Sequence, residues 1–283
     1  MSKRQSSFVL IGSLAISGTI LLQMGLYVIS LLSGWNMKFN LVEICHSWLG
    51  AIGLSSLEYV LDGLVIFTPL CAIWIIGSQI VQSSKLERRF RLYEDKKLTD
   101  EITKLYGKKD QEQIIVLSHP APIAITMGLI CPKIILSTGL INLLTKDELK
   151  AVISHEMYHK KNRDPFKLFL LSLSSSILWY IPIQKWFHRT YQIIQEILAD
   201  EYAIKQQDTT VNLGSALLKM LKVGKLKKMP FTYASFADTS VNYRIKYMLH
   251  PVKEVPLGIP FRVVFISLTV FSLICGLFIY VLV

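Results

Sequence analysis

Long uncharged runs of apolar residues dominate the two ends of the chain. Residues Phe8–Leu32, Gly63–Val81 and Val263–Val283 contain no charged side chain. A helix of about 20 apolar residues crosses the hydrocarbon core of a bilayer, which is about 30 Å thick. The pattern therefore predicts three transmembrane helices. The first run follows basic residues, as a signal peptide does, but it is longer than a typical signal core and lacks a small-residue cleavage site at its end, which favours a retained helix.

A fourth apolar run, Leu168–Ile183, is harder to place. As a helix it is short for crossing a membrane, it contains several serines, and Pro182 interrupts it. Trp179 and Tyr180 are typical of a membrane interface. These features argue against a complete crossing. They leave three arrangements open: a hairpin that returns to the same side, a segment at the interface, or a helix buried within a folded domain.

A helix with polar residues and regularly spaced apolar residues is predicted over residues 144–160. Thr145 is a good N-cap, and Glu148 three residues later completes a capping box. Apolar residues then follow at helical spacing, as expected for a helix that packs on one face.

The distribution of charge predicts the topology. The chain is 52% hydrophobic with a formal net charge of +11. Nearly all its Lys and Arg lie within residues 84–261, which the positive-inside rule places in the cytoplasm together with the N-terminus. The predicted organisation has three parts: residues 1–83 with two transmembrane helices (about 8–32 and 63–81) and a short extracytoplasmic loop; a cytoplasmic domain at 84–261 that includes 168–183 at or near the membrane; and a C-terminal transmembrane helix at 262–283.

The basic stretch 84–110 raises binding of nucleic acid or anionic lipid as an alternative function. The same stretch contains acids throughout, so it reads as a mixed-charge helix next to the membrane: Glu87, Glu94, Asp95, Asp100, Glu101 and Asp110. We therefore expect contact with the lipid bilayer but no direct binding of nucleic acid.

Three residues of the predicted helix have the spacing H-E-x-x-H. His155 and His159 stand one helical turn apart, so both imidazoles can reach one metal ion. Glu156 lies beside them and can act as a general base towards a water molecule. The simpler alternative is a helix whose two histidines and glutamate face solvent.

A third ligand is expected downstream, because catalytic zinc takes three protein ligands and keeps one position for water. Glu196 and Asp200 lie on one helix face in the stretch "EILADEYA". We predict Glu196 as the third ligand and Asp200 as the acceptor that fixes the tautomer of a ligating histidine. A solvated acidic face is the alternative. Because Glu196 must return to His159, the apolar run between them cannot end on the far side of a membrane.

These stretches resemble the membrane-bound gluzincin metallopeptidases, from about Pro122 to Ala203. "HKKNRDP" and "WYIPIQKW" are closer to the BlaR1/MecR1 type, peptidase family M56, than to the related HtpX/Ste24 type, family M48. The single short apolar run before Glu196 points the same way, because HtpX-type chains usually carry two full crossings there. The resemblance implies a mainly α zinc-peptidase domain with a small β-ribbon or sheet, transmembrane helices, and one Zn²⁺ per chain.

The resemblance also implies roles for two further segments. An edge strand above the zinc would pair with an extended substrate, although a buried β-ribbon fits the sequence equally; its residues are Ile123, Ala124, Ile125 and Thr126. Arg244, in a short R-I motif, would hold Asp200 or steady an oxyanion, and a solvated arginine is the alternative.

The resulting prediction is a zinc endopeptidase that acts in regulatory proteolysis at the cytoplasmic face of a bacterial cell membrane. Its partner would be a protein or peptide substrate, such as a BlaI-like repressor or a membrane protein. Receptors of the BlaR1 type carry a penicillin-binding sensor after the last membrane helix, and this sequence ends there, so β-lactam sensing is not expected. Two alternatives stay open: an HtpX-like quality-control protease, and a non-catalytic membrane signalling or immunity protein that keeps the fold.

Overall fold

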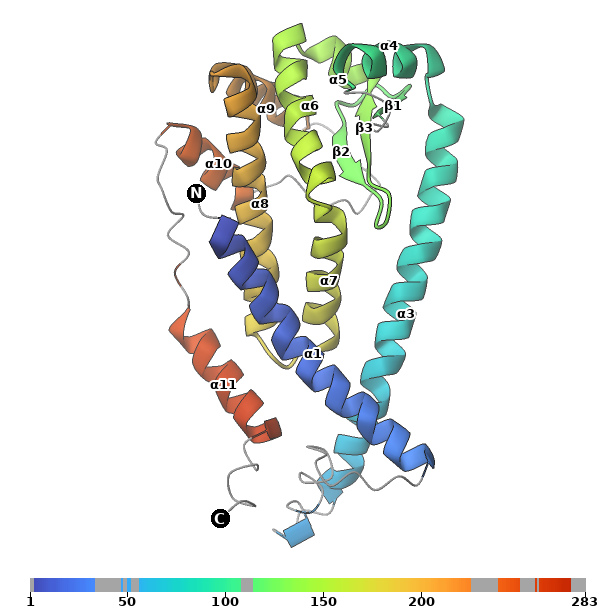
Figure 1. Cartoon of the computed structure of the whole chain (residues 1–283), viewed down its shortest axis with the longest axis vertical. Helices are drawn as coiled ribbons and strands as arrows, with labels where there is room; N and C mark the ends of the chain where they lie inside the picture. Colours follow the sequence, from blue (N-terminus) through green and yellow to red (C-terminus); the bar gives the residue numbers. More distant parts are fainter. Residues whose placement is uncertain are drawn as a thin grey trace. The chain divides into compact units, whose positions relative to one another are not determined.

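The computed structural model (Figure 1) describes residues 3–33, 47, 50–51, 56–107, 114–224, 239–249, 258 and 260–275. It divides the chain into two compact units. The first unit comprises Met1–Ser6, Val81–Phe169 and Tyr191–Val255, and the second comprises Ser7–Ile80, Leu170–Thr190 and Pro256–Val283. The architecture is mainly α with one small sheet, as predicted.

The second unit is built on long apolar helices. Helices α1 (Lys3–Ser33) and α3 (Ser56–Tyr93) each contain a stretch long and apolar enough to cross a membrane. Both helices extend beyond the predicted spans 8–32 and 63–81. In α3, the charged residues that follow the second span continue the same helix. Helix α11 (Phe261–Cys275) covers the first part of the predicted third span. The remainder of that span, and most of the predicted extracytoplasmic loop, lie outside the described residues.

The apolar run 168–183 folds as the corner between two helices. Helix α7 (Asp164–Ile177) ends in a turn in which the Ile181 amide donates to the Leu178 carbonyl, and α8 (Ile183–Gln207) begins directly after Pro182. Pro182 has no amide hydrogen, so it cannot extend α7 but can precede a new helix. The segment thus comprises most of α7 and the turn that leads into α8, and the choice among the three predicted arrangements stays a prediction. Its depth in a membrane stays a prediction.

Polar contacts hold the start of α8 within the second unit. The Ser13 hydroxyl on α1 donates to the Gln184 side chain at 2.5 Å. The Ser267 hydroxyl on α11 accepts a hydrogen bond from the Ile183 amide at 2.9 Å. This contact satisfies an amide at the first turn of α8, where no intrahelical acceptor exists.

The first unit contains a three-stranded sheet. Strands β1 (Ile114–Leu117), β2 (Ala124–Met127) and β3 (Lys133–Ser137) lie in the order β1-β3-β2. Strand β3 is parallel to β1 and antiparallel to β2. Gly128, with φ of 115°, begins the turn between β2 and β3 in a conformation that favours glycine. Since β2 is last in the strand order and pairs with β3 on one side, it is an edge strand of the described sheet.

Helix α6 (Lys146–Lys161) packs between this sheet and helix α9 (Val211–Gly224) (Figure 1). Thr145 caps α6, and Glu148 completes the predicted capping box. Helices α4 (Lys96–Tyr106), α5 (Thr138–Leu143) and α10 (Thr239–Leu249) complete the described part of the unit. The core joins the inner faces of the sheet, α6 and α9 through buried side chains that include Val116, Ala124, Ile134, Leu136, Leu149, Val152, Ile153 and Ala216.

Candidate metal centre and active site

Helices α6 and α8 bring three metal-ligating side chains to one point. His155 and His159 lie one turn apart on α6, and their Nε2 atoms are 3.1 Å apart. On α8, Oε2 of Glu196 lies 3.4 Å from Nε2 of His155, and Oε1 of Glu196 lies 3.5 Å from Nε2 of His159. Tetrahedral coordination at about 2.1 Å places neighbouring ligand atoms about 3.4 Å apart. One donor atom from each residue lies within 4.8 Å of the other two, so the set is compact enough to hold a metal ion such as zinc.

Two buried carboxylates orient the imidazoles. Nδ1 of His155 lies 2.9 Å from Asp200 Oδ1, and Nδ1 of His159 lies 2.8 Å from Asp164 Oδ2. An ionised carboxylate only accepts hydrogen bonds, so each Nδ1 carries the proton and each Nε2 presents its lone pair to the metal position. Asp200 was predicted from the sequence, whereas Asp164 was not. The signal for Asp164 was its place in "HKKNRDP", directly after the turn that ends α6.

Arg244 on α10 contacts both the third metal-ligating residue, Glu196, and the carboxylate of Asp200. Its Nε and Nη2 atoms donate to the two oxygens of Asp200, each at 2.7 Å, and its Nη1 lies 3.1 Å from Glu196 Oε2. The residue is 2% exposed, so the solvated alternative is wrong. A bidentate guanidinium fixes both the position and the charge of a buried carboxylate.

The electrostatics favour charged carboxylates and proton-binding histidines. Burial lowers the pKa of His155, but contacts with Asp200 and Glu196 outweigh burial and raise this pKa to about 9. Burial likewise opposes the raised pKa of His159, which follows from the hydrogen bond to Asp164 and the charge of Glu196. The pKa of Glu196 is well below its usual range despite burial, because His155 and Arg244 stabilise the anion. Protons therefore compete with a cation for the histidine nitrogens.

Glu156 follows His155 on α6 and is 3% exposed. The Thr126 hydroxyl on β2 lies 2.7 Å from Glu156 Oε2 and 2.9 Å from the Glu156 main-chain oxygen. From the sequence, Thr126 was expected only as part of a substrate-binding strand. Its contact with Glu156 was not predictable from spacing, because it joins residues 30 positions apart.

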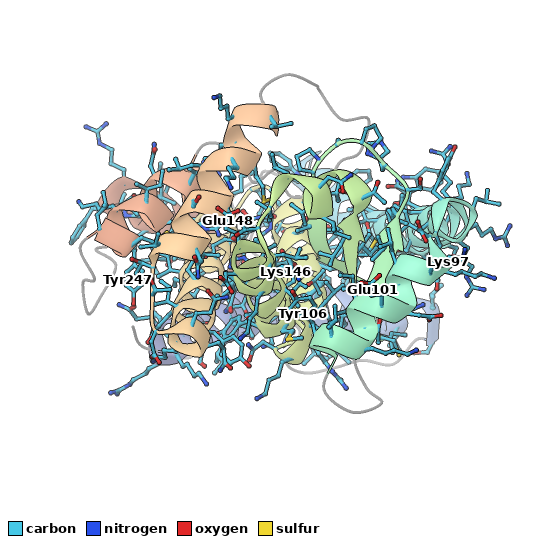
Figure 2. All side chains as sticks on the ribbon, turned by 90° about the horizontal axis from the view of Figure 1, so that it is seen from above. Lys97, Glu101, Tyr106, Lys146, Glu148 and Tyr247 are labelled. Atoms are coloured by element: carbon cyan, nitrogen blue, oxygen red, sulfur yellow. The ribbon has the colours of Figure 1, made fainter. Side chains whose placement is uncertain are left out.

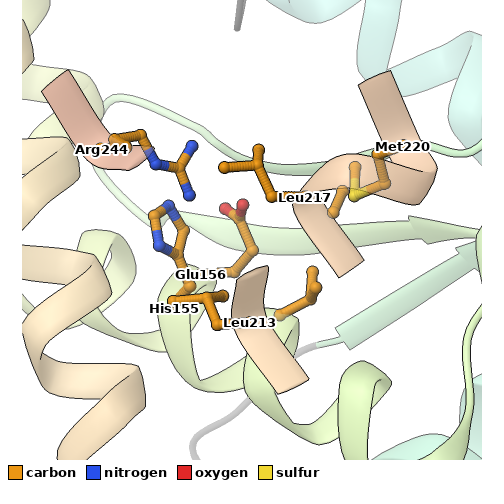
Figure 3. A pocket seen from close by; sticks show the side chains of 8 residues that line it. His155, Glu156, Leu213, Leu217, Met220 and Arg244 are labelled. Atoms are coloured by element: carbon orange, nitrogen blue, oxygen red, sulfur yellow. The ribbon is translucent and has the colours of Figure 1, made fainter. Parts of the chain in front are cut away.

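A recess opens beside Glu156 (Figure 3). Its volume is about 270 Å³ when the open mouth is included. The guanidinium of Arg244 and the carboxylate of Glu156 face each other on one side, and apolar side chains of α9 lie on the other. The α9 residues are Leu213, Leu217 and Met220. Glu156 and Arg244 thus adjoin an apolar wall.

The predicted edge strand is displaced by one residue. Strand β2 begins at Ala124 and ends at Met127. Ile123 precedes it and bonds to Ser137 through both its amide and its carbonyl. The strand contacts α6, and within the described sheet its other side has no neighbouring strand.

Comparison with known proteins adds independent information. The sequence matches the family described as BlaR1 peptidase M56 over residues 56–248. It is similar to "Regulatory protein BlaR1" of Bacillus licheniformis, at 28% identity over 165 residues, which cover 54% of this chain and 27% of that protein. It is also similar to "Protease HtpX homolog 2" of Methanosarcina mazei and of Methanosarcina acetivorans, at 34% identity over 119 residues, which cover 41% of this chain and 37% of each relative. The chain thus spans well under half the length of these relatives.

Proposed function

Because the chain belongs to the BlaR1 peptidase M56 family, we propose that it is a membrane-embedded zinc endopeptidase. The observation that carries the proposal is the convergence of three ligand atoms beside a buried glutamate. His155 and His159 come from one helix and Glu196 from another, 37 residues further along the chain. Ordinary surface acids and histidines do not converge in this way.

His155, His159 and Glu196 would hold the ion, and Asp200 and Asp164 would keep both imidazoles in the correct tautomer. When bound, zinc would lower the pKa of a water molecule toward about 7 and polarise a peptide carbonyl. The buried positive charge of Arg244 helps to retain the ionised Glu196 and Asp200.

Glu156 would be the general base and then the general acid. Its carboxylate adjoins His155 and faces the recess. It would accept the proton of the attacking water and deliver it to the nitrogen of the leaving amine. Such proton transfer contributes about 10²–10⁴-fold to a rate.

The substrate would be an extended segment of a protein. The open side of β2 offers main-chain donors and acceptors for one more strand, which supports binding by strand addition. The apolar wall of Leu213, Leu217 and Met220 would take an apolar side chain near the bond that is cleaved. Charged or bulky polar side chains at that position would lose hydration without gaining a partner.

The cellular setting follows from the charge pattern and the apolar helices. We place the enzyme in a bacterial cytoplasmic membrane as a multi-pass protein whose catalytic domain faces the cytoplasm. The similarity to a regulatory protein supports a role in signalling proteolysis, with a BlaI-like repressor as one type of substrate. The similarity to the HtpX homologues supports, as a second candidate, the turnover of membrane proteins.

The test compares the wild type with Glu156→Gln, both purified in detergent. We would measure bound zinc per chain and the cleavage of co-expressed candidate proteins and of the chain itself. We expect about one zinc in both proteins and cleavage only by the wild type. Zinc without cleavage in either protein would favour a non-catalytic signalling protein. The absence of zinc from both would overturn the assignment of the site.

A further inference from the structure

Thr126 lies where the predicted substrate strand meets the predicted base. Its hydroxyl is 2.7 Å from Glu156 Oε2 and 2.9 Å from the main-chain oxygen of the same residue. Side chains alternate along a strand, so Thr126 shares the face of Ala124, which also lines the recess beside Glu156. The backbone of Thr126 meanwhile pairs with Ile134 of β3. One residue therefore contacts the base through its side chain and belongs to the edge strand through its main chain.

The two acceptors of this hydroxyl differ in what they need. A threonine hydroxyl has one hydrogen to donate and can also accept hydrogen bonds. The Glu156 main-chain oxygen lies inside α6, where carbonyls accept from the amide four residues ahead. The carboxylate has no such partner within the helix. The contact to Oε2 is also the shorter of the two, so the carboxylate is the better acceptor when it is charged.

The hydroxyl thus lies within hydrogen-bond distance of Oε2 and holds the carboxylate towards the recess. Its second contact, to the main-chain oxygen, ties β2 to α6 at the residue that carries the carboxylate. A donor fixed on a packed strand needs no rearrangement to hold its acceptor, which is what preorganisation requires.

We propose that Thr126 is a positioning residue for Glu156 and that its hydroxyl keeps the carboxylate of the base directed towards the recess. This inference rests on the proposed peptidase function. It assigns the side chain of β2 a part in turnover that is separate from the binding of substrate by the strand's main chain. A purely structural role, in which Thr126 fastens β2 to α6, would instead affect stability and substrate binding.

Thr126→Val and Thr126→Ser separate these roles. Valine keeps the shape and the strand preference of threonine but removes the hydroxyl, whereas serine keeps the hydroxyl. We expect Thr126→Val to lower kcat about tenfold, the effect of one hydrogen bond to a charged group, with KM and zinc content unchanged. We expect Thr126→Ser to stay within about twofold of the wild type. Thr126→Ala serves as a second variant that lacks the hydroxyl if valine packs poorly.

Binding of a small peptide hydroxamate gives a readout that needs no turnover. This probe would place a hydroxyl group next to Glu156, so calorimetry on the zinc-loaded protein reports the alignment of the base. We expect Thr126→Val to weaken binding several-fold in the wild-type background but not in the Glu156→Gln background.

The outcomes distinguish this inference from the proposed function. Wild-type protein that binds zinc but cleaves nothing would count against the peptidase, while the hydroxamate comparison would still decide the role of Thr126. Equal kcat and equal hydroxamate binding in Thr126→Val would overturn the positioning role. Loss of activity in both Thr126→Val and Thr126→Ser, with a raised KM, would also overturn it in favour of a packing role.

Discussion

The two ends of helix α6 carry glutamates of the same chemistry in different surroundings. At the N-terminal end, Glu148 accepts hydrogen bonds from the Thr145 amide, the Ser215 hydroxyl and the Lys219 ammonium, at 2.8, 2.6 and 2.7 Å. Figure 2 shows Glu148 next to Lys146 at this end of the helix. Eight residues later, the Glu156 carboxylate accepts one hydrogen bond from a described residue, Thr126, and lines an open recess.

The difference teaches how one helix separates a structural acid from a reactive one. Three donors engage both oxygens of Glu148 and lower its pKa to about 2 despite burial. Glu156 is buried with spare acceptor capacity beside a metal-binding set, and a general base requires that. Helix α9 serves both ends, since Ser215 and Lys219 face Glu148 while Leu217 lines the recess.

The largest expected effect is the loss of activity when Glu156 is neutralised, and the same substitution at Glu148 is the control. Glu156→Gln should lower kcat by about 10²–10⁴-fold with zinc retained, because the glutamine cannot accept the proton. Glu148→Gln should leave kcat within about twofold, because it lies outside the proposed chemistry. Steady-state cleavage with zinc analysis of both proteins tests the comparison. Similar losses of kcat in the two variants would remove the distinction between the ends of α6.

The next largest expected effect is a loss of zinc affinity when Asp164, the partner of His159, is substituted. Asp164→Asn should weaken zinc binding by about 10–100-fold, because the acceptor that fixes the tautomer of His159 loses its charge. Asp147→Asn, an exposed acid in the first turn of α6, is the matched control and should leave the affinity unchanged. Competition with a chromophoric chelator measures both. Equal affinities would show that Asp164 does not support the ligand.

Substitution of Glu148, at the N-terminal end of α6, should lower the stability of the fold. Glu148→Gln should lower the free energy of unfolding by about 2 kcal/mol near neutral pH, since Lys219 loses its anionic partner and the other donors lose a charged acceptor. The folded pKa lies below the unfolded one, so this contribution is present above about pH 4.5 and is lost as the pH falls towards 2. The difference in Tm between wild type and variant should therefore close on acidification. A constant difference across this range would exclude the ionised state as its source.

The smallest expected effect concerns the wall that α9 gives to the recess. Leu217→Ala should shift the preference among peptide substrates towards larger apolar side chains, by roughly tenfold in kcat/KM. Leu218→Ala changes the neighbouring residue, whose side chain is 61% exposed, and should not alter the preference. A peptide series that varies one position tests this. Unchanged selectivity in Leu217→Ala would separate the recess from substrate recognition.

Much of α6 was readable from the sequence because its signals are local. The capping box of Thr145 and Glu148 and the one-turn spacing of His155 and His159 depend on helical geometry alone. The helix turned out to start and end within two residues of the predicted bounds. Membrane-length apolar helices followed from run length in the same way, whereas the mainly α class was implied by the family resemblance.

The residues that contact this helix from other parts of the chain could not be predicted from local spacing. Asp164 has no periodic relation to His159, and its position depends on the turn at Arg163, where φ is 52°. Thr126 reaches the site from another element, 30 positions from Glu156, so no local pattern predicts its contact. A contact of Arg244 with Asp200 was expected only from the family resemblance. The role of Asp200 was expected, but its bidentate clamp by Arg244 depends on where α10 packs.

The sequence by itself determined which residues have the chemistry of a metal site and where the chain is apolar enough for a membrane. These properties belong to single residues and to short helical spacings. Only the tertiary structure decided that Glu196 lies 3.4 Å from His155, that Arg244 is buried, and that Glu148 and Glu156 have different surroundings. Those outcomes depend on the packing of separate elements, because neighbours distant in the chain supply the donors, the burial and the charge that fix what each side chain can do.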